Sequence, residues 1–146
     1  MNQKVLSRAV VRFFENSCRR KLMSEVLEVT AASSTPDCQA HKLQAVLMPL
    51  AAHYFLKAKN HAARPLDPVA RFHLGNCAKL DRLNWLGDIS ERGLRQSHSL
   101  MVNYLYDLEH IEKNHETYAQ QQAVVAASAI TKLVKTPARD VVPAGD

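Results

Sequence analysis

The sequence contains little glycine and little proline, four and six residues in 146. This scarcity excludes a collagen-like chain and a low-complexity chain, because both need those residues in abundance. No apolar run reaches the ~18 residues that a membrane-spanning helix requires, so the sequence predicts a soluble protein. Hydrophobic residues make up 47% of the chain, which is enough for one globular domain with a buried core.

Cysteine and aromatic residues are also scarce. The three cysteines, Cys18, Cys38 and Cys77, are odd in number, lack CxxC spacing and follow no hydrophobic signal segment. We therefore expect reduced thiols in an intracellular protein. Aromatic residues, at 6%, offer little for base stacking, and no nucleic-acid-binding motif is present. Neither a nucleic acid nor a membrane is an expected partner.

Basic residues exceed acidic ones, which gives a net charge of +5 at pH 7. This excess suits an anionic ligand such as a phosphate-bearing cofactor. Much of it lies within residues 1–23, where Glu15 is the single acid against Lys4, Arg8, Arg12, Arg19, Arg20 and Lys21. A basic surface helix and a mitochondrial presequence can both have this composition. We expect a cytoplasmic location, with a mitochondrial one as the alternative.

Hydrophobic spacing predicts helices in the first part of the chain. Apolar residues at intervals of three and four indicate a helix over 4–30 and a second one from Asp37 or Cys38 to about Asn60. The polar stretch TAASSTPD between them indicates a loop. Pro49 lies inside the second helix and removes a backbone hydrogen bond, so we expect a kink or a break there.

The pattern changes after a proline-containing loop at 61–68. Two short apolar runs, 69–74 and 80–86, flank Gly75-Asn76-Cys77, and this arrangement predicts a β-hairpin. A helix capped by Asp88 or Ser90 should follow.

The last part of the chain contains one more strand candidate and one helix candidate. Alternating apolar residues favour a strand at 101–108, a closing helix should run over 109–135, and the tail 136–146 should fray. Helices that alternate with short strands predict a mixed α/β or α+β domain, helix-rich overall, with helices flanking a short sheet.

Familiar catalytic motifs are missing from the sequence. It contains no Walker lysine loop, GxGxxG, GxSxG or HExxH, and the spacing of His110 and His115 does not suit a helical metal site, so no metal is expected. The remaining candidates are polar residues among apolar ones: His73, Asn76, Arg82, Asn84, Ser97, Asn103, Tyr104, Tyr106 and Asp107. Taken singly, each has an ordinary structural explanation; a lone histidine in a strand is most often a hydrogen-bonded structural residue.

These residues nevertheless lie in a longer pattern. The segment VARFHLGNCAKLDRLNW at 69–85 precedes GLRQS at 93–97 and LMVNYLYDL at 100–108. These motifs closely resemble the C-terminal part of the malonyl-CoA decarboxylases, and the resemblance covers about residues 43–119. It implies that 37–135 form the C-terminal part of a catalytic domain related to the GNAT acyltransferases. Residues 1–36, a basic amphipathic helix and a loop, and the flexible tail 136–146 are expected to lie outside it.

The resemblance also implies a reaction. The family converts malonyl-CoA to acetyl-CoA and carbon dioxide without a metal or an organic cofactor, using a serine–histidine pair assisted by a tyrosine. By motif, the catalytic histidine is His73 and the tyrosine is Tyr106. Loss of the carboxylate leaves an enolate, which needs stabilisation of its oxygen and a proton for its carbon. Asn76, Arg82 and Asn84 are candidates to bind and orient the substrate.

The sequence departs from the family pattern in three places. The family's serine lies in a TLSP-type segment, and these 146 residues contain none; Ser33 and Ser34 have the wrong neighbours. Cys77 stands where the family tends to have glycine, which is expected to strain the turn or to add a thiol near His73. His98-Ser99 replaces a small Ala-Gly pair, and the added bulk is expected to crowd a closely packed helix.

Three functions therefore stay open. The chain can be the C-terminal portion of a decarboxylase, weak or inactive alone, that forms a homo-oligomer or associates with the missing catalytic half. It can instead be a noncatalytic remnant that binds CoA or associates with subunits. As a third possibility, the basic N-terminal helix docks on an acidic partner or a membrane surface.

Overall fold

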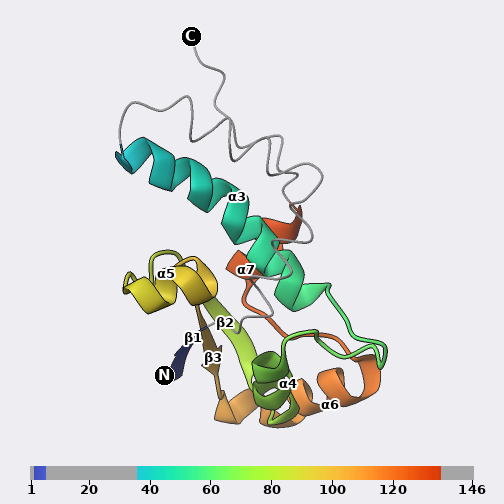
Figure 1. Ribbon diagram of the computed structural model, residues 1–146. Coiled ribbons are helices and arrows are strands. Elements are labelled where there is room, and N and C mark those ends of the chain that lie inside the picture. The colour runs from blue at the N-terminus through green and yellow to red at the C-terminus, as the bar shows by residue number, and fades with distance from the viewer. Residues whose placement is uncertain (1, 6–35, 136–146) are drawn as a thin grey trace.

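The computed structural model describes residues 2–5 and 36–135, and it contains helices around a small antiparallel sheet (Figure 1). The α+β class predicted from the sequence is confirmed. In chain order the elements are β1 (Asn2–Val5), α3 (Pro36–Leu56), α4 (Pro68–Gly75), β2 (Lys79–Asn84), α5 (Glu91–Ser97), β3 (Met101–Leu105), the 3-10 turn η1 (Leu108–His110), α6 (Ile111–Gln121) and α7 (Ser128–Lys135).

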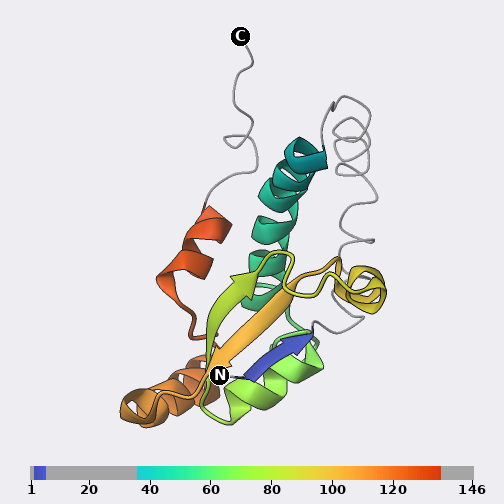
Figure 2. The same ribbon diagram turned by 90° about the vertical axis from the view of Figure 1, so that its left-hand side faces the viewer.

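The sheet has the strand order β1-β3-β2, and both pairings are antiparallel. Figure 2 shows β3 between its two neighbours, with α5 beside β1 and α7 on the β2 side. The register shifts between Leu80 and Arg82, so that one additional residue lies in β2. This bulge places both Leu80 and Leu83 on the buried face, although they are three positions apart and a regular strand would point them to opposite faces.

The core lies where α3 and α7 meet that buried face. The C-terminal half of α3 contributes Ala51, Ala52, Tyr54 and Phe55, each at most 1% exposed, and the sheet contributes Leu80, Val102 and Tyr104. Helix α3 continues through Pro49 as one helix, so the predicted break is absent and its end lies at Leu56 rather than near Asn60. Packing against α7 and the sheet compensates for the hydrogen bond that proline removes.

The predicted strand at 69–74 is wrong, and with it the predicted hairpin. These residues form helix α4, which Asp67 caps and in which Pro68 occupies the first turn. Proline at the start of a helix costs little, because its missing N–H would have no intrahelical partner there. The second half of the predicted hairpin is correct, since β2 spans Lys79–Asn84.

The predicted helix over 109–135 is divided into η1, α6 and α7. Gln122 ends α6 in a left-handed conformation, with φ 50°. The chain then runs beside β2, where Leu80 donates its N–H to Val125 and accepts one from Ala127, both at 2.9 Å. The helix capped by Ser90 is confirmed as α5, and the strand predicted at 101–108 is confirmed over Met101–Leu105 as β3, whereas Leu108 begins η1.

The expectations for the two ends of the chain mostly lie outside the described residues. Within the predicted helix over 4–30, only residues 4–5 are described, and they belong to β1, which pairs with β3. The rest of that helix, the loop at 30–35 and the tail 136–146 fall outside.

Both local departures from the family pattern lie at left-handed backbone. Cys77, just after the end of α4, has φ 69°, and His98 and Ser99 after α5 have φ 50° and 62°. A side chain beyond glycine in this region costs free energy, because Cβ approaches the following carbonyl oxygen. Cys77 is therefore strained where the family tends to have glycine, as expected.

Replacing Cys77 by glycine is expected to raise the free energy of unfolding by about 1 kcal/mol, because the relief of Cβ strain exceeds the added entropy of the unfolded chain. Cys77→Ala is the matched control: it also removes the thiol, but it keeps Cβ and should give no such gain. Urea unfolding of both variants measures the difference. Equal stabilities of the glycine and alanine variants would mean that the turn is not strained.

Candidate active site

Helix α4 is anchored at its N-terminus by a buried carboxylate. Asp67 is 2% exposed, and its Oδ1 accepts a hydrogen bond from the Ala70 N–H at 2.8 Å. Its Oδ2 accepts one from the Tyr54 hydroxyl of α3 at 3.3 Å. The cap satisfies a helix N–H and places negative charge at the positive end of the helix dipole. One side chain thus fixes both the start of α4 and its contact with α3.

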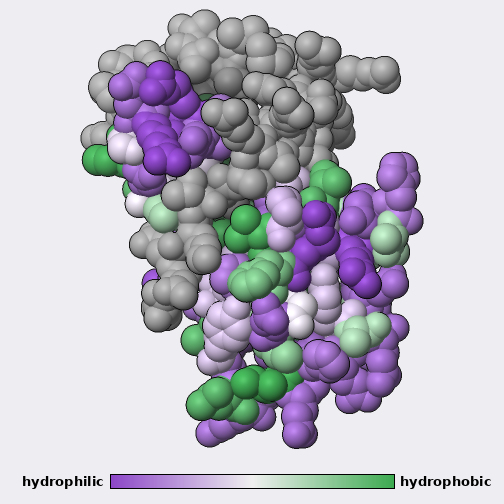
Figure 3. Space-filling model, turned by 60° about the horizontal axis from the view of Figure 1, so that its bottom comes forward, coloured by the Kyte–Doolittle hydropathy of each residue, from purple (hydrophilic) through white to green (hydrophobic). Residues whose placement is uncertain are grey.

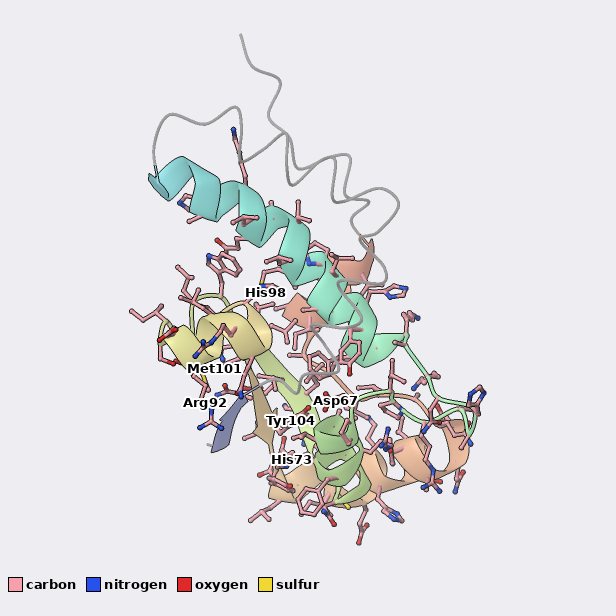
Figure 4. All side chains as sticks on the ribbon, in the orientation of Figure 1. Asp67, His73, Arg92, His98, Met101 and Tyr104 are labelled. Carbon is pink, nitrogen blue, oxygen red and sulfur yellow. The ribbon has the colours of Figure 1, made fainter. Side chains whose placement is uncertain are left out.

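This anchored helix directs His73 into the protein. His73 is 2% exposed and lies face to face with the ring of Tyr104, at 4.4 Å between ring centroids and 15° between planes. Figure 4 shows His73, Tyr104 and Asp67 close together between α4 and the sheet. The stack determines the plane of the imidazole.

Tyr106 supplies the second constraint on the same ring. Its hydroxyl lies 2.8 Å from His73 Nδ1, a hydrogen bond in which the donor depends on the histidine tautomer. Tyr106 directly follows β3 and is 40% exposed, whereas His73 is buried. The pair therefore connects a buried imidazole to a phenol at the surface, and this arrangement can move a proton between a bound molecule and the interior.

Tyr104 is neutral in this environment. Burial is the main cause that raises the pKa of its phenol, and the nearby charge of Asp67 raises it further. Its hydroxyl oxygen is buried without a hydrogen-bond partner among the described residues. Tyr104 therefore acts here through its ring, as an uncharged surface against which His73 packs.

The structure brings together His73 and Tyr106, but not all of the predicted site residues. Asn76 caps the C-terminus of α4, where its side chain donates to the Phe72 carbonyl at 2.9 Å. Arg82 pairs in register with Asn103, and Asn84 donates to the Asn103 side chain at 2.8 Å. Because neighbouring residues on a strand face opposite ways, Arg82 and Asn84 lie on the sheet face opposite Tyr104 and His73.

Sequence analysis missed Asp67 and Tyr54 and gave Tyr104 no role. An available signal was Asp67-Pro68, since a capping residue followed by proline at the first helical position is typical of a helix start. This signal would have predicted helix α4 and placed Asp67 at the N-terminus of the helix. No comparable signal exists for Tyr54, because its contact with Asp67 depends on how α3 packs.

A cluster of possible metal ligands near η1 is given no function here. The side chains of Asp107, Glu109 and His110 bring possible ligand atoms within 4.8 Å of one another, but Asp107 Oδ2 is already 2.9 Å from His110 Nδ1. In the described part of the chain, no helix is long and apolar enough to cross a membrane.

The two buried tyrosines near Asp67 should respond oppositely to loss of the hydroxyl. Tyr104→Phe removes a buried oxygen that has no partner among the described residues, so the free energy of unfolding should rise by about 1 kcal/mol at pH 7. Tyr54→Phe removes the donor to Asp67 and should lower it by about 1–3 kcal/mol.

Alkaline pH should widen the effect of Tyr104→Phe. The folded protein keeps this phenol protonated, whereas the unfolded chain releases its proton near the ordinary pKa of about 10, so the wild type loses stability above that pH. Urea unfolding at neutral and alkaline pH tests both statements. A destabilised Tyr104→Phe protein with unchanged pH dependence would contradict them.

Comparison with known proteins shows the family of this chain. The family model described as the malonyl-CoA decarboxylase C-terminal domain matches residues 6–143, which extends beyond the motif-bearing stretch at both ends. Mitochondrial malonyl-CoA decarboxylase of Rattus norvegicus is 43% identical over 95 residues, 65% of this chain and 19% of the relative. That of Anser anser anser is 41% identical over 92 residues, 63% of this chain and 18% of the relative.

Solved structures agree as well. Malonyl-CoA decarboxylase from Agrobacterium vitis superposes with a TM-score of 0.75 at 41% identity, over 88% of this chain and 34% of that one. The enzyme from Rhodopseudomonas palustris gives 0.73 at 43% identity, over 90% and 32%. The chain spans about a fifth of the length of these curated relatives. The chain belongs to the malonyl-CoA decarboxylase family, and it corresponds to the C-terminal domain of that family.

Proposed function

We propose that this domain supplies the histidine and tyrosine of a site that converts malonyl-CoA to acetyl-CoA and carbon dioxide. The observation that carries the proposal is the 2.8 Å contact between His73 Nδ1 and the Tyr106 hydroxyl. The two residues are 33 positions apart in sequence, and each stands where the family motif has its catalytic histidine and assisting tyrosine. A GNAT-like arrangement that binds acyl-CoA is part of this proposal.

The reaction requires few protein groups: hydrogen-bond donors to the enolate oxygen and an acid that protonates the carbon. The bond between the carboxylate and the α-carbon breaks, carbon dioxide leaves, and the electron pair forms an enolate of the thioester. Donors aimed at the enolate oxygen lower the barrier, and an acid then protonates the carbon. The buried imidazole of His73 and the phenol of Tyr106 form a path for that proton, and Tyr104 holds the imidazole ring in place.

The other candidates take lesser parts in the proposal. Asn76, at the end of α4 that carries His73, is placed to orient a substrate there. Arg82 and Asn84 would contact a part of the substrate remote from the thioester, because they lie on the other face of the sheet. The serine of the pair would come from a TLSP-type segment outside these 146 residues.

A role in subunit association is the second candidate function. Leu86, Ile89 and Leu94, on the loop after β2 and on α5, are 47%, 73% and 51% exposed. Exposed apolar groups of this size suit contact with another polypeptide, whether a second copy or a serine-bearing half.

For the cellular location of the protein, the cytoplasm remains our first proposal. The mitochondrial names of the vertebrate relatives support the alternative, a mitochondrial location.

Decarboxylation should depend on His73 more than on Tyr106. The assay is acetyl-CoA formation from malonyl-CoA by the purified chain, with and without a polypeptide that carries the serine segment of a relative. His73→Ala should lower the rate by about 10²–10⁴-fold, the usual contribution of a general acid or base. Tyr106→Phe, which removes one hydroxyl, should lower it less.

His61→Ala is the matched control, because it removes an exposed imidazole on the loop before α4. It should leave the rate unchanged. If His73→Ala keeps its activity per folded molecule, the catalytic assignment is wrong. If CoA binds saturably but no variant or mixture turns over malonyl-CoA, the noncatalytic function is favoured.

A further inference from the structure

The edge of the sheet at β1 has a different origin from the rest of the sheet. β1 spans four residues and pairs antiparallel with β3, from Asn2 opposite Tyr104 to Val5 opposite Met101. The family match begins at residue 6, so β1 lies outside it, whereas β2 and β3 lie within it. The strand that completes the sheet therefore comes from a segment that the family model does not match.

Strand β3 has the burial of a central strand. Val102, Asn103 and Tyr104 are all buried, although consecutive residues of a strand point to opposite faces of the sheet. β2 pairs with one edge of β3, and among the described residues only β1 pairs with the other edge. Without β1, that edge would present N–H and C=O groups that are a template for pairing with another strand.

The residues of β1 favour a strand only weakly. β1 reads Asn-Gln-Lys-Val, and only its valine is a residue type that strands favour, whereas asparagine and lysine are depleted in strands. Its length of four residues is also below the usual length of about five or six. We therefore expect β1 to separate from β3 more easily than β2 does, because a short strand near a chain end opens at low cost in free energy.

Exposed apolar side chains lie next to this edge. Leu86 and Ile89, on the loop after β2, and Leu94 of α5 are exposed, and α5 contacts β1 and lies beside it in Figure 2. By contrast, the lower face of the molecule in Figure 3 is mostly hydrophilic, with a few hydrophobic residues among the others. A strand edge beside apolar groups suits a second polypeptide that adds its own strand to the sheet.

The same edge leads to the candidate active site. β1 begins opposite Tyr104, whose ring stacks on His73, and Tyr106 directly follows β3. Another strand in the register of β1 would therefore run beside the residues that hold the histidine. A polypeptide docked in this way would reach the site from the side of Tyr104.

The part of the relatives that lies outside the match indicates the partner. This chain covers 34% of the Agrobacterium vitis enzyme and 32% of the Rhodopseudomonas palustris enzyme, so about two thirds of each enzyme lies outside. The histidine motif lies in these 146 residues, whereas a TLSP-type serine segment does not. A polypeptide with that serine segment is therefore the partner that the site requires.

We propose that β1 is a replaceable strand, and that an extended segment of a serine-bearing polypeptide takes its place on β3. Leu86, Ile89 and Leu94 supply the apolar contact for this partner. The proposal rests on the proposed function for the identity of the partner. Until the partner binds, β1 keeps the edge of β3 closed.

Proline in β1 opens the edge selectively. The N–H groups of consecutive strand residues point to opposite edges, so one of residues 3 and 4 directs its N–H toward β3. The double variant Gln3→Pro/Lys4→Pro removes that N–H in either case. Gln3→Ala/Lys4→Ala is the matched control, because it shortens the same side chains but keeps both N–H groups.

Calorimetric titration measures the affinity of each full-length variant for the part of the Agrobacterium vitis enzyme outside the match. The apparent affinity scales with the fraction of molecules whose edge is open, so the proline variant should bind about tenfold or more tightly than the wild type. The alanine variant should bind like the wild type. Leu94→Asp should weaken binding about tenfold, since a charge replaces an apolar contact. Gln120→Asp, which places the same charge on exposed α6, should have no effect.

Equal affinities of the folded proline and alanine variants would overturn the proposal. A proline variant that dimerises in sedimentation and ignores the partner would also overturn it, because the edge would then bind a second copy. If the proline variant loses its circular dichroism, Leu94→Asp decides: affinity equal to that of Gln120→Asp would contradict the docking surface.

His73→Ala separates this proposal from the proposed function. It should abolish turnover of malonyl-CoA in the mixture but leave the affinity for the partner unchanged. Binding that depends on β1 as predicted, in mixtures that never form acetyl-CoA, would support strand exchange and contradict the proposed function.

Discussion

The contact on which the site depends is the pair of hydrogen bonds to Asp67. This buried carboxylate accepts from the Ala70 N–H and from the Tyr54 hydroxyl, and so it joins the start of α4 to the core helix α3. The rotation of α4 then determines which of its residues enter the core. His73 is carried inward against Tyr104, and Tyr106 meets it from the end of β3. If the cap is lost, α4 loses its anchor to α3, and the contacts of His73 with Tyr104 and Tyr106 have to hold the imidazole without a fixed helix.

The sequence motifs point to two residues that the structure places together, while part of the secondary structure was predicted wrongly. The motifs identified His73 and Tyr106, which the structure brings within hydrogen-bond distance. The strand predicted at 69–74 is a helix, because a short apolar run fits either structure by periodicity alone. In the same way, the break after Gln122 depends on pairing of 125–127 with Leu80, a long-range contact that no local pattern reveals.

Helix α4 serves two environments with only eight residues. Its inner face holds a buried histidine between two tyrosines, with little charge apart from the Asp67 cap. Its outer face carries Arg71 and Phe72 beside a cationic pocket. The low polarity inside strengthens hydrogen bonds around His73, and the cations outside would attract an anionic ligand. The two departures at Cys77 and His98-Ser99 lie at left-handed backbone in the turns after α4 and α5.

The central claim is that Tyr106 and Tyr104 together hold His73 in one orientation. Nitrogen NMR of the histidine side chains measures this directly, because the ring nitrogens report hydrogen bonding and tautomer separately. In the Tyr106→Phe protein, the Nδ1 resonance of His73 should move away from its wild-type position while the signals of exposed histidines such as His61 stay in place. An unchanged Nδ1 resonance would contradict the account, because the hydroxyl of Tyr106 would then not contact the imidazole in solution.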